Sequence, residues 1–431
     1  MTVNQLMIAI KNSSDTPKKL AQLLQTLQQS SINEPAPALL QGLSQTLQTR
    51  SHTLGIVYVL VAAGSQGLPQ QANPQFVTLC QYLLLEFDVD QSRMAPDKFT
   101  TLCHLYREHS ILLNEPQAAL QPLRIALTNF QASHELITPI HADIFQICVL
   151  TKCYSMAMPL LAHPAYDVDP EISGMTARDF LLYSYYGSLI HIGRKQYSEA
   201  IGMLLHSITA PAMATSAITI AALKKYILLC LIQKGTFGSL PKYTPSQVTR
   251  CLKADCQAYM DLANAYSADP ATKLEETAAK HHQAFDNDGN MGLLQLALEA
   301  HTMRAVQRLT RTYMTLSLSD IASRAQLKGA QEAELLVLRM IEAGQIHASI
   351  DDSAGMVTFL EDPEQYYGAE VVDRLSKQIA LSNELSARVQ AANCQVSLDK
   401  AYLQKTQMRD FGPRFDDPGE ISSEQQMVFQ P

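Results

Sequence analysis

The sequence lacks a hydrophobic run long enough to cross a bilayer. Its longest apolar stretch, LGIVYVLVAA at residues 54–63, is about half as long as the roughly 20 residues that a membrane helix needs. The N-terminal segment also lacks a basic region followed by an apolar one, which is the pattern of a secretory signal. We therefore expect a soluble, intracellular protein that makes no contact with membranes.

Motifs of the common enzyme classes are missing as well. We find no H-E-x-x-H or H-x-H metal pattern, no glycine-rich phosphate loop and no G-x-S-x-G nucleophile elbow. The histidine doublet, His281 and His282, lies in a polar helical segment, and DNDGN at residues 286–290 lacks the spacing of a calcium loop. We predict no catalytic residue, no metal, no cofactor and no small-molecule substrate, and a tight turn at DNDGN.

The cysteines lack the pairing that marks a redox or zinc site. There are eight, none in a C-x-x-C motif, and the two C-x4-C spacings have no accompanying histidine or cysteine pair. Since most lie in apolar helical segments, we expect buried free thiols. They are Cys80, Cys103, Cys148, Cys153, Cys230, Cys251, Cys256 and Cys394.

Basic residues are outnumbered by acidic ones, 33 to 41. The formal net charge is −8, whereas a protein that binds nucleic acid through phosphate contacts needs a basic face. The composition is otherwise that of a globular protein, with 47% hydrophobic residues, and its 431 residues suggest two or three domains.

What the chain does contain, as far as about residue 310, is helical periodicity. Apolar residues recur at i, i+3, i+4 and i+7, with short Pro, Gly or Asn breaks between segments. This pattern predicts an α-solenoid of paired helices, and a compact helical bundle is the alternative. The clearest pair flanks residues 193–195, where Tyr197, Ala200, Leu204 and Ser207 have the spacing of a tetratricopeptide second helix.

The pattern changes at residues 316–359. Ser317 or Ser319 can cap a short helix, a second helix of sequence AQEAELLVLRMIEAG follows, and Gly344 is placed to end it. Alternating residues from Ile346 to Ile350, a turn at Gly355 and the stretch MVTF then indicate a two-stranded ribbon. Helix, turn, helix and ribbon make a winged helix.

This winged helix is too acidic to read DNA. Between residues 315 and 362 there are three basic and eight acidic side chains. The helix that would enter the major groove carries Glu332, Glu334 and Glu342. We expect no direct contact with nucleic acid, and predict instead that the sheet edge binds a neighbouring strand. The predicted interface residues are Ile346, Ala348, Ile350, Val357 and Phe359.

A long helix and a polar tail complete the chain. A narrow apolar stripe on an otherwise polar helix suits packing against partner helices. Its residues, the predicted helix-bundle interface, are Val372, Leu375, Ile379, Leu385 and Val389. The predicted domains are helical repeats at 1–190, a second helical part at 191–310 with the winged helix at 311–362, the bundle helix at 363–408 and a disordered tail at 409–431.

These residues resemble a known family. The segment from Leu318 to Phe359, with the pair Met340–Ile341, is similar to the winged-helix end of a PCI domain, the module shared by the proteasome lid, the COP-nine signalosome and translation initiation factor three. The stretches HADIFQICVLTKC, PAMATSAITIAALKKYILLCLIQKG, LPKYTP and DNDGNMGLL resemble the family of third subunits of the signalosome.

The resemblance implies a mostly helical scaffold without catalytic activity, in the complex that removes NEDD eight from cullins and so regulates cullin–RING ligases. It implies assembly through the winged-helix sheet and the C-terminal helix, with the first and eighth subunits as neighbours, in the cytoplasm and the nucleus. The alternatives are a PCI subunit of the proteasome lid or of the initiation factor, a PCI protein of messenger RNA export, and an enzyme whose site leaves no motif.

Overall fold

The structure is a computed structural model that describes residues 8, 10–11, 17–29, 38–41, 43, 50–66, 73–162, 167–212, 214–268, 271–361 and 368–404. The chain divides into two compact units, Met1–Phe359 and Leu360–Pro431. Each unit is described by itself.

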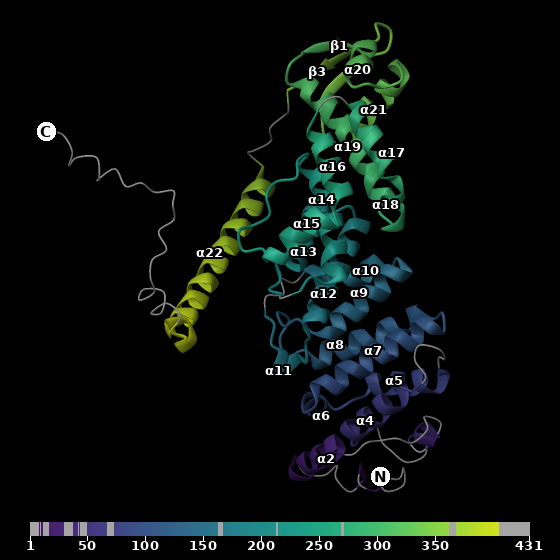
Figure 1. The fold of residues 1–431 in the computed structure, drawn as a ribbon, viewed down its shortest axis with the longest axis vertical. Helices are drawn as coiled ribbons and strands as arrows, with labels where there is room; N and C mark the ends of the chain where they lie inside the picture. The colour runs from purple at the N-terminus through teal and green to yellow at the C-terminus, as the bar shows by residue number, and fades with distance from the viewer. Residues whose placement is uncertain are drawn as a thin grey trace, which may run out of the picture. The chain divides into compact units, whose positions relative to one another are not determined.

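The first unit is a succession of helices packed one on the next in chain order (Figure 1). Those of its N-terminal half are α2 (Pro17–Gln29), α4 (Thr53–Gly64), α5 (Pro74–Leu85), α6 (Val89–Arg93), α7 (Pro96–Leu112), the 3-10 turn η1 (Pro116–Ala119), α8 (Leu120–Phe130), α9 (Pro139–Thr151) and α10 (Tyr154–Ala162). Those that follow are α11 (Pro170–Ser173), α12 (Ala177–Gly193), α13 (Tyr197–Thr209), α14 (Ala217–Gln233), α15 (Ser246–Ala254), α16 (Gln257–Ser267), α17 (Ala271–Lys280), α18 (His282–Asn287) and α19 (Met291–Thr310).

Local sequence explains where several helices begin. The Asn73 side chain accepts hydrogen bonds from the backbone N–H groups of Gln75 and Phe76, and Pro74 occupies the first turn of α5. At α12 the Thr176 and Asp179 side chains form a reciprocal capping box. Such caps satisfy backbone groups that a helix cannot pair internally.

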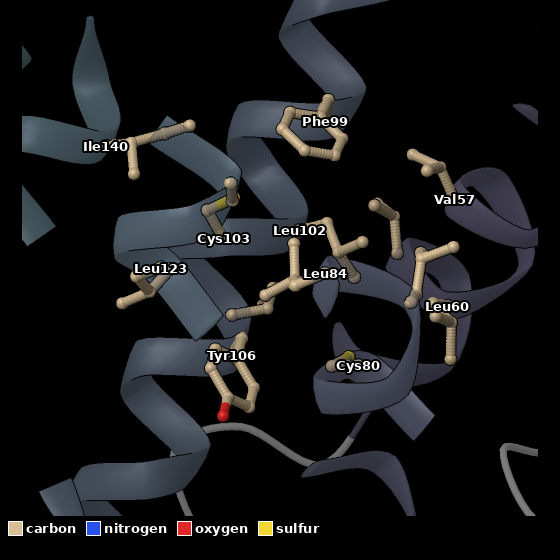
Figure 2. Packing of buried hydrophobic residues seen from close by; sticks show 14 of the residues in the cluster. Val57, Leu60, Cys80, Leu84, Phe99, Leu102, Cys103, Tyr106, Leu123 and Ile140 are labelled. Atoms are coloured by element: carbon tan, nitrogen blue, oxygen red, sulfur yellow. The ribbon is translucent and has the colours of Figure 1, made fainter. Parts of the chain in front are cut away.

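The hydrophobic core of the N-terminal half is built around α7. Phe99, Leu102, Cys103 and Tyr106 point from α7 toward side chains of α4, α5, α8 and α9 (Figure 2). All four are at most 1% exposed, so one helix supplies contacts to four neighbours. Two further clusters follow along the chain, one from Ala200 to Leu294 and one within the winged helix.

The predicted helical hairpin and the α-solenoid are confirmed. Helix α12 ends at Gly193, α13 begins at Tyr197, and Ala200, Leu204 and Ser207 are almost fully buried. The small side chains of Ala200 and Ser207 let α13 approach its neighbours closely.

The winged helix has one strand more than the sequence predicted. Its elements are β1 (Thr315–Ser317), α20 (Leu318–Arg324), α21 (Ala330–Glu342), β2 (Ala348–Asp351) and β3 (Met356–Phe359). The three strands form an antiparallel sheet in the order β1-β3-β2. Strand β1 was missed because three residues are too few to show an alternating pattern.

The second unit contains one long helix, α22 (Ala369–Leu398), with no buried residue. It ends where Asp399 adopts an extended conformation, and the Asp399 carboxylate accepts a hydrogen bond from the backbone N–H of Ala401. The predicted disordered tail at 409–431 lies outside the described residues.

The cysteines are free thiols, as predicted, but not all are buried. Cys153 and Cys251 are half-buried, and Cys394 is exposed because it lies on α22. Burial raises the pKa of the Cys80 and Cys103 thiols well above their ordinary value, so these two stay protonated.

Candidate protein-interaction surfaces

The winged helix is held together by caps and by a small core. The Ser317 side chain accepts a hydrogen bond from the Asp320 backbone N–H and caps α20, as one of two predicted serines. Gly344, with φ of 65°, follows the end of α21. The sheet packs on the buried sides of both helices, through Ile321 and Val337 among others.

The sheet offers two outer edges. Strand β3 is central and pairs with β1 at Leu316–Val357 and with β2 at Ile350–Val357. Strand β2 pairs on one side only within the described residues. Because unpaired N–H and C=O groups of an outer strand can bind another strand, β2 provides a docking edge that β3 cannot.

The predicted sheet-interface residues turn inward. Ile346, Val357 and Phe359 are buried, and Ala348 and Ile350 are half-buried against the same core cluster. Ile346 also precedes β2 rather than belonging to it. Their side chains therefore hold the sheet in place, and what an outside strand can reach is the β2 backbone with the exposed Ser349 and Asp351.

The outward face of α21 differs from that of a DNA-reading helix. Leu335 and Leu338 are 58% and 41% exposed there, and Glu342 follows on the same face. The exposed Arg339 is on this face as well, but the leucines and the glutamate around it cannot donate hydrogen bonds to base edges or phosphates. An apolar and acidic helix face is suited to contact with protein.

The turn between β2 and β3 is closed by one carboxylate. Asp351 Oδ1 accepts hydrogen bonds from Ser353 N, Ser353 Oγ and Ala354 N. These bonds, chiefly that from the Ser353 hydroxyl, lower the pKa of Asp351. Gly355, with φ of 63°, completes the turn as predicted.

The stripe on α22 is exposed over its whole length. Its five predicted residues are each at least 39% exposed. Elsewhere on the helix the ion pairs Lys377–Asp373 and Arg388–Glu384, at 2.7 and 2.8 Å, link charged residues one turn apart. An apolar stripe that no described residue of its own unit covers is a candidate surface for partner helices.

A partly buried polar network, which the sequence did not predict, joins α14, α16 and the turn before α19. Lys224 Nζ donates to both carboxylate oxygens of Asp288 at 2.8 Å, and Tyr259 Oη donates to Asp288 Oδ2 at 2.8 Å. Asn290 Nδ2 donates to Tyr259 Oη, and Lys225 donates to Asn290. The tight turn predicted at DNDGN is made by Asp288 to Asn290, because Asp286 and Asn287 still belong to α18. The side chains of Asp288 and Asn290 connect this turn to α14 and α16. Adjacent lysines inside an apolar helix were the available signal.

A second polar cluster joins α7, α9 and α12. The buried Asp143 carboxylate lies 2.5 Å from Arg107 Nη1 and 2.8 Å from His104 Nδ1, and His104 Nε2 lies 3.6 Å from Asp179. Burial lowers the pKa of His104, but the Asp143 and Asp179 charges outweigh it and raise the pKa overall. The cluster borders a pocket of about 410 Å³ that has both polar and apolar lining residues. The residues of the cluster lie too far apart in sequence to form a motif.

Two kinds of feature are absent from the described residues. No group of three His, Cys, Asp or Glu side chains in this part of the chain is placed to hold a metal ion. None of the helices described is both long enough and apolar enough to span a membrane.

Comparison with known proteins identifies the family. A family model described as "COP9 signalosome complex subunit 3, N-terminal helical repeats" matches residues 9–248. The chain is 34% identical to an Arabidopsis thaliana protein named COP9 signalosome complex subunit 3, over 96% of this chain and 97% of that protein. The chain belongs to the COP9 signalosome subunit 3 family.

Two further matches agree with this membership. The subunit 3 protein of Dictyostelium discoideum is 35% identical, over 90% of this chain and 92% of the relative. The PCI-domain family model matches residues 278–361, which contain α19 and the whole winged helix. The predicted presence of a PCI domain is therefore confirmed, and this chain is a signalosome subunit of the PCI class.

Proposed function

We propose that this protein is a non-catalytic scaffold subunit of the COP9 signalosome. The observation that carries the proposal is the similarity to proteins named as its third subunit over 96% and 90% of the chain. In this role it supports the complex that removes NEDD eight from cullins, and so reaches cullin–RING ligases indirectly. The first and eighth subunits are its neighbours, and it works in both cytoplasm and nucleus.

The first assembly surface is the outer edge of β2. A neighbouring subunit adds a strand there, while Ile346, Val357 and Phe359 keep the sheet in shape from within. The proposal is supported by the one-sided pairing of β2 and by the exposure of Ser349 and Asp351. The exposed leucines of α21 favour a protein partner over nucleic acid on the outward face of that helix.

The second assembly surface is the α22 stripe, which packs among the C-terminal helices of other subunits. A 30-residue helix without a buried residue gains little from its own unit, since most helical stability in proteins comes from packing an apolar face. Covering Val372, Leu375 and Ile379 supplies that packing.

Affinity purification of the tagged full chain, followed by mass spectrometry, tests the proposal. We expect the signalosome subunits, with the first and eighth retained longest as salt is raised. Recovery of proteasome-lid or initiation-factor subunits in their place would contradict it, because those PCI complexes have different partners.

Variants separate the two surfaces. Leu375→Asp with Ile379→Asp should release the complex, whereas Ser376→Asp with Ala380→Asp, which lie outside the stripe and about 100° around the same helix, should not. Ser349→Lys should block strand addition at β2, and Gln345→Lys, exposed just before the strand, is its control. If the double α22 variant and Ser349→Lys both retained all partners, neither surface would be an assembly surface.

A further inference from the structure

An apolar pocket of about 430 Å³ lies in the helical-repeat region, where α11 and α12 face the α13–α14 loop and the start of α15. Met175, Thr219 and Val248 are buried at its base, and Val168, 41% exposed, stands at its mouth with Pro170 and Pro211. The volume is within the range of about 300–1,000 Å³ that is usual for ligand pockets.

The wall formed by α11 and α12 is fixed in position. Gly174, with φ of 66°, forms the turn between the two helices, and a Cβ atom there would lie 2.9 Å from Asp97 Oδ1 and 3.1 Å from Asp97 N. The turn therefore packs directly against the start of α7. The capping box of Thr176 and Asp179 fixes the first turn of α12.

The opposite wall is tied to α15. Thr215 Oγ1 in the α13–α14 loop lies 3.2 Å from Cys251 Sγ, and Ser216 caps α14 by accepting a hydrogen bond from Ile218 N. Both walls thus exist before anything binds, which reduces the ordering cost of binding.

Charge around the pocket is acidic on the α11 side, whereas the exposed Arg178 follows the lining residue Ala177 on α12. No lining residue is itself charged, but the segment 167–171 alternates acidic and lining positions. The Asp169 carboxylate is occupied in capping α11. Asp167 and Glu171 are exposed, and neither forms an ion pair with a described residue. The rim beside Val168 and Pro170 is therefore negative.

We propose that this pocket binds a linear segment of a partner protein that inserts one large apolar side chain and carries lysine or arginine next to it. A preformed apolar hollow is the usual receptor for an anchor residue, and the acidic rim selects basic flanks. The chain's own MVF at 427–429 is a poorer occupant because it follows Glu424 and has no basic neighbour. The proposal does not depend on which complex contains the protein.

The test uses the purified full chain and a phage library of random 12-residue peptides. Enriched peptides are synthesised with a fluorophore, and their affinity is measured by anisotropy. Ala214→Glu places a charged side chain at an exposed lining position, and Ala217→Glu is the matched control on the same loop-to-helix junction, outside the lining. Asp167→Lys with Glu171→Lys reverses the rim.

We expect enriched peptides with one large apolar residue and nearby lysine or arginine. Ala214→Glu should weaken them about tenfold or more, the loss that follows from excluding an anchor. The rim reversal should weaken them about two- to fivefold, as for exposed ion pairs, and Ala217→Glu should leave affinity unchanged.

Several results would overturn the proposal. They are the absence of enriched peptides, enrichment of peptides with acidic flanks, and binding that is insensitive to Ala214→Glu. A gain in peptide affinity on deleting residues 405–431 would identify the chain's own tail as the occupant. A dimer in sedimentation velocity that Ala214→Glu dissociates would identify a second copy.

Discussion

Helices α14 and α22 use the same backbone structure in opposite surroundings. Ten of the 17 residues of α14 are buried, whereas none of the 30 residues of α22 is. Helix α14 is apolar on nearly all sides, as expected of a helix enclosed by its own chain, and α22 is apolar along a stripe. The comparison teaches that α14 is stabilised within the chain, whereas the apolar side of α22 is exposed, as our proposal of a partner surface requires.

Ion pairs in the helical repeats and on α22 also differ in their burial. In the helical repeats, Asp143 is buried between Arg107 and His104 and joins three helices. On α22, Asp373 pairs with Lys377 one turn away, in full contact with solvent. The first kind of ion pair determines how helices are arranged, and the second adds a little to a helix that is already formed.

The largest difference in stability should appear when the charge of Asp143 and that of Asp373 are removed in separate variants. Asp143→Asn leaves Arg107 buried with only the half-exposed Glu108 for charge compensation, and should lower the free energy of unfolding by about 3–5 kcal/mol. Asp373→Asn should cost about 0.3–0.5 kcal/mol. Urea denaturation of the purified chain measures both free energies of unfolding. Equal losses of stability in the two variants would contradict the contrast between the buried and the exposed ion pair.

Truncating one leucine in each helix gives the next largest difference. Leu228→Ala in α14 creates a cavity at a fully buried position and should cost about 2–5 kcal/mol. Leu375→Ala in α22 removes a side chain that is 52% exposed and should change stability by less than about 0.5 kcal/mol. A large loss of stability from Leu375→Ala in the isolated chain would show that the stripe is packed in a core of the chain itself.

The smallest difference is in pH dependence. The folded-state pKa of His104 is raised above the ordinary value of about 6.5, so its contribution is complete below that pH and is lost as the pH rises through the folded pKa. The groups facing it are Asp143, Asp179 and Arg107. Helix α22 contains no histidine, so it makes no histidine-dependent contribution to the change of stability with pH.

His104→Gln tests this dependence. Wild-type stability should fall between pH 5.5 and 8.5 by more than that of the variant, as measured by urea denaturation at each pH. Parallel pH profiles for the two proteins would show that His104 does not couple proton binding to folding.

The winged helix was largely predictable because local signals mark it. Ser317, Gly344 and Gly355 act as cap, stop and turn, as their residue types indicated. Which face of the sheet packs on the core was harder to predict, because apolar residues that alternate along a strand can face either a core or a partner. Here Val357 and Phe359 face the core, and only the strand pairing shows that β1 and β2 are the outer strands.

The polar clusters could not be predicted because their partners come from separate helices. Arg107 and Asp143 are 36 residues apart, and Lys224 and Asp288 are 64. The stripe on α22 was predictable from its heptad spacing, but a stripe specifies the kind of surface that covers it, not which chain supplies that surface.

Hydrogen exchange of α22 is the most direct test of the central claim, that this helix is an assembly surface. Amide exchange is followed by mass spectrometry in the isolated chain and in the purified complex. We predict that amides of α22 exchange much faster than those of α14 in the isolated chain, and become protected in the complex. Protection of α22 equal to that of α14 in the isolated chain, with no change on assembly, would contradict the account.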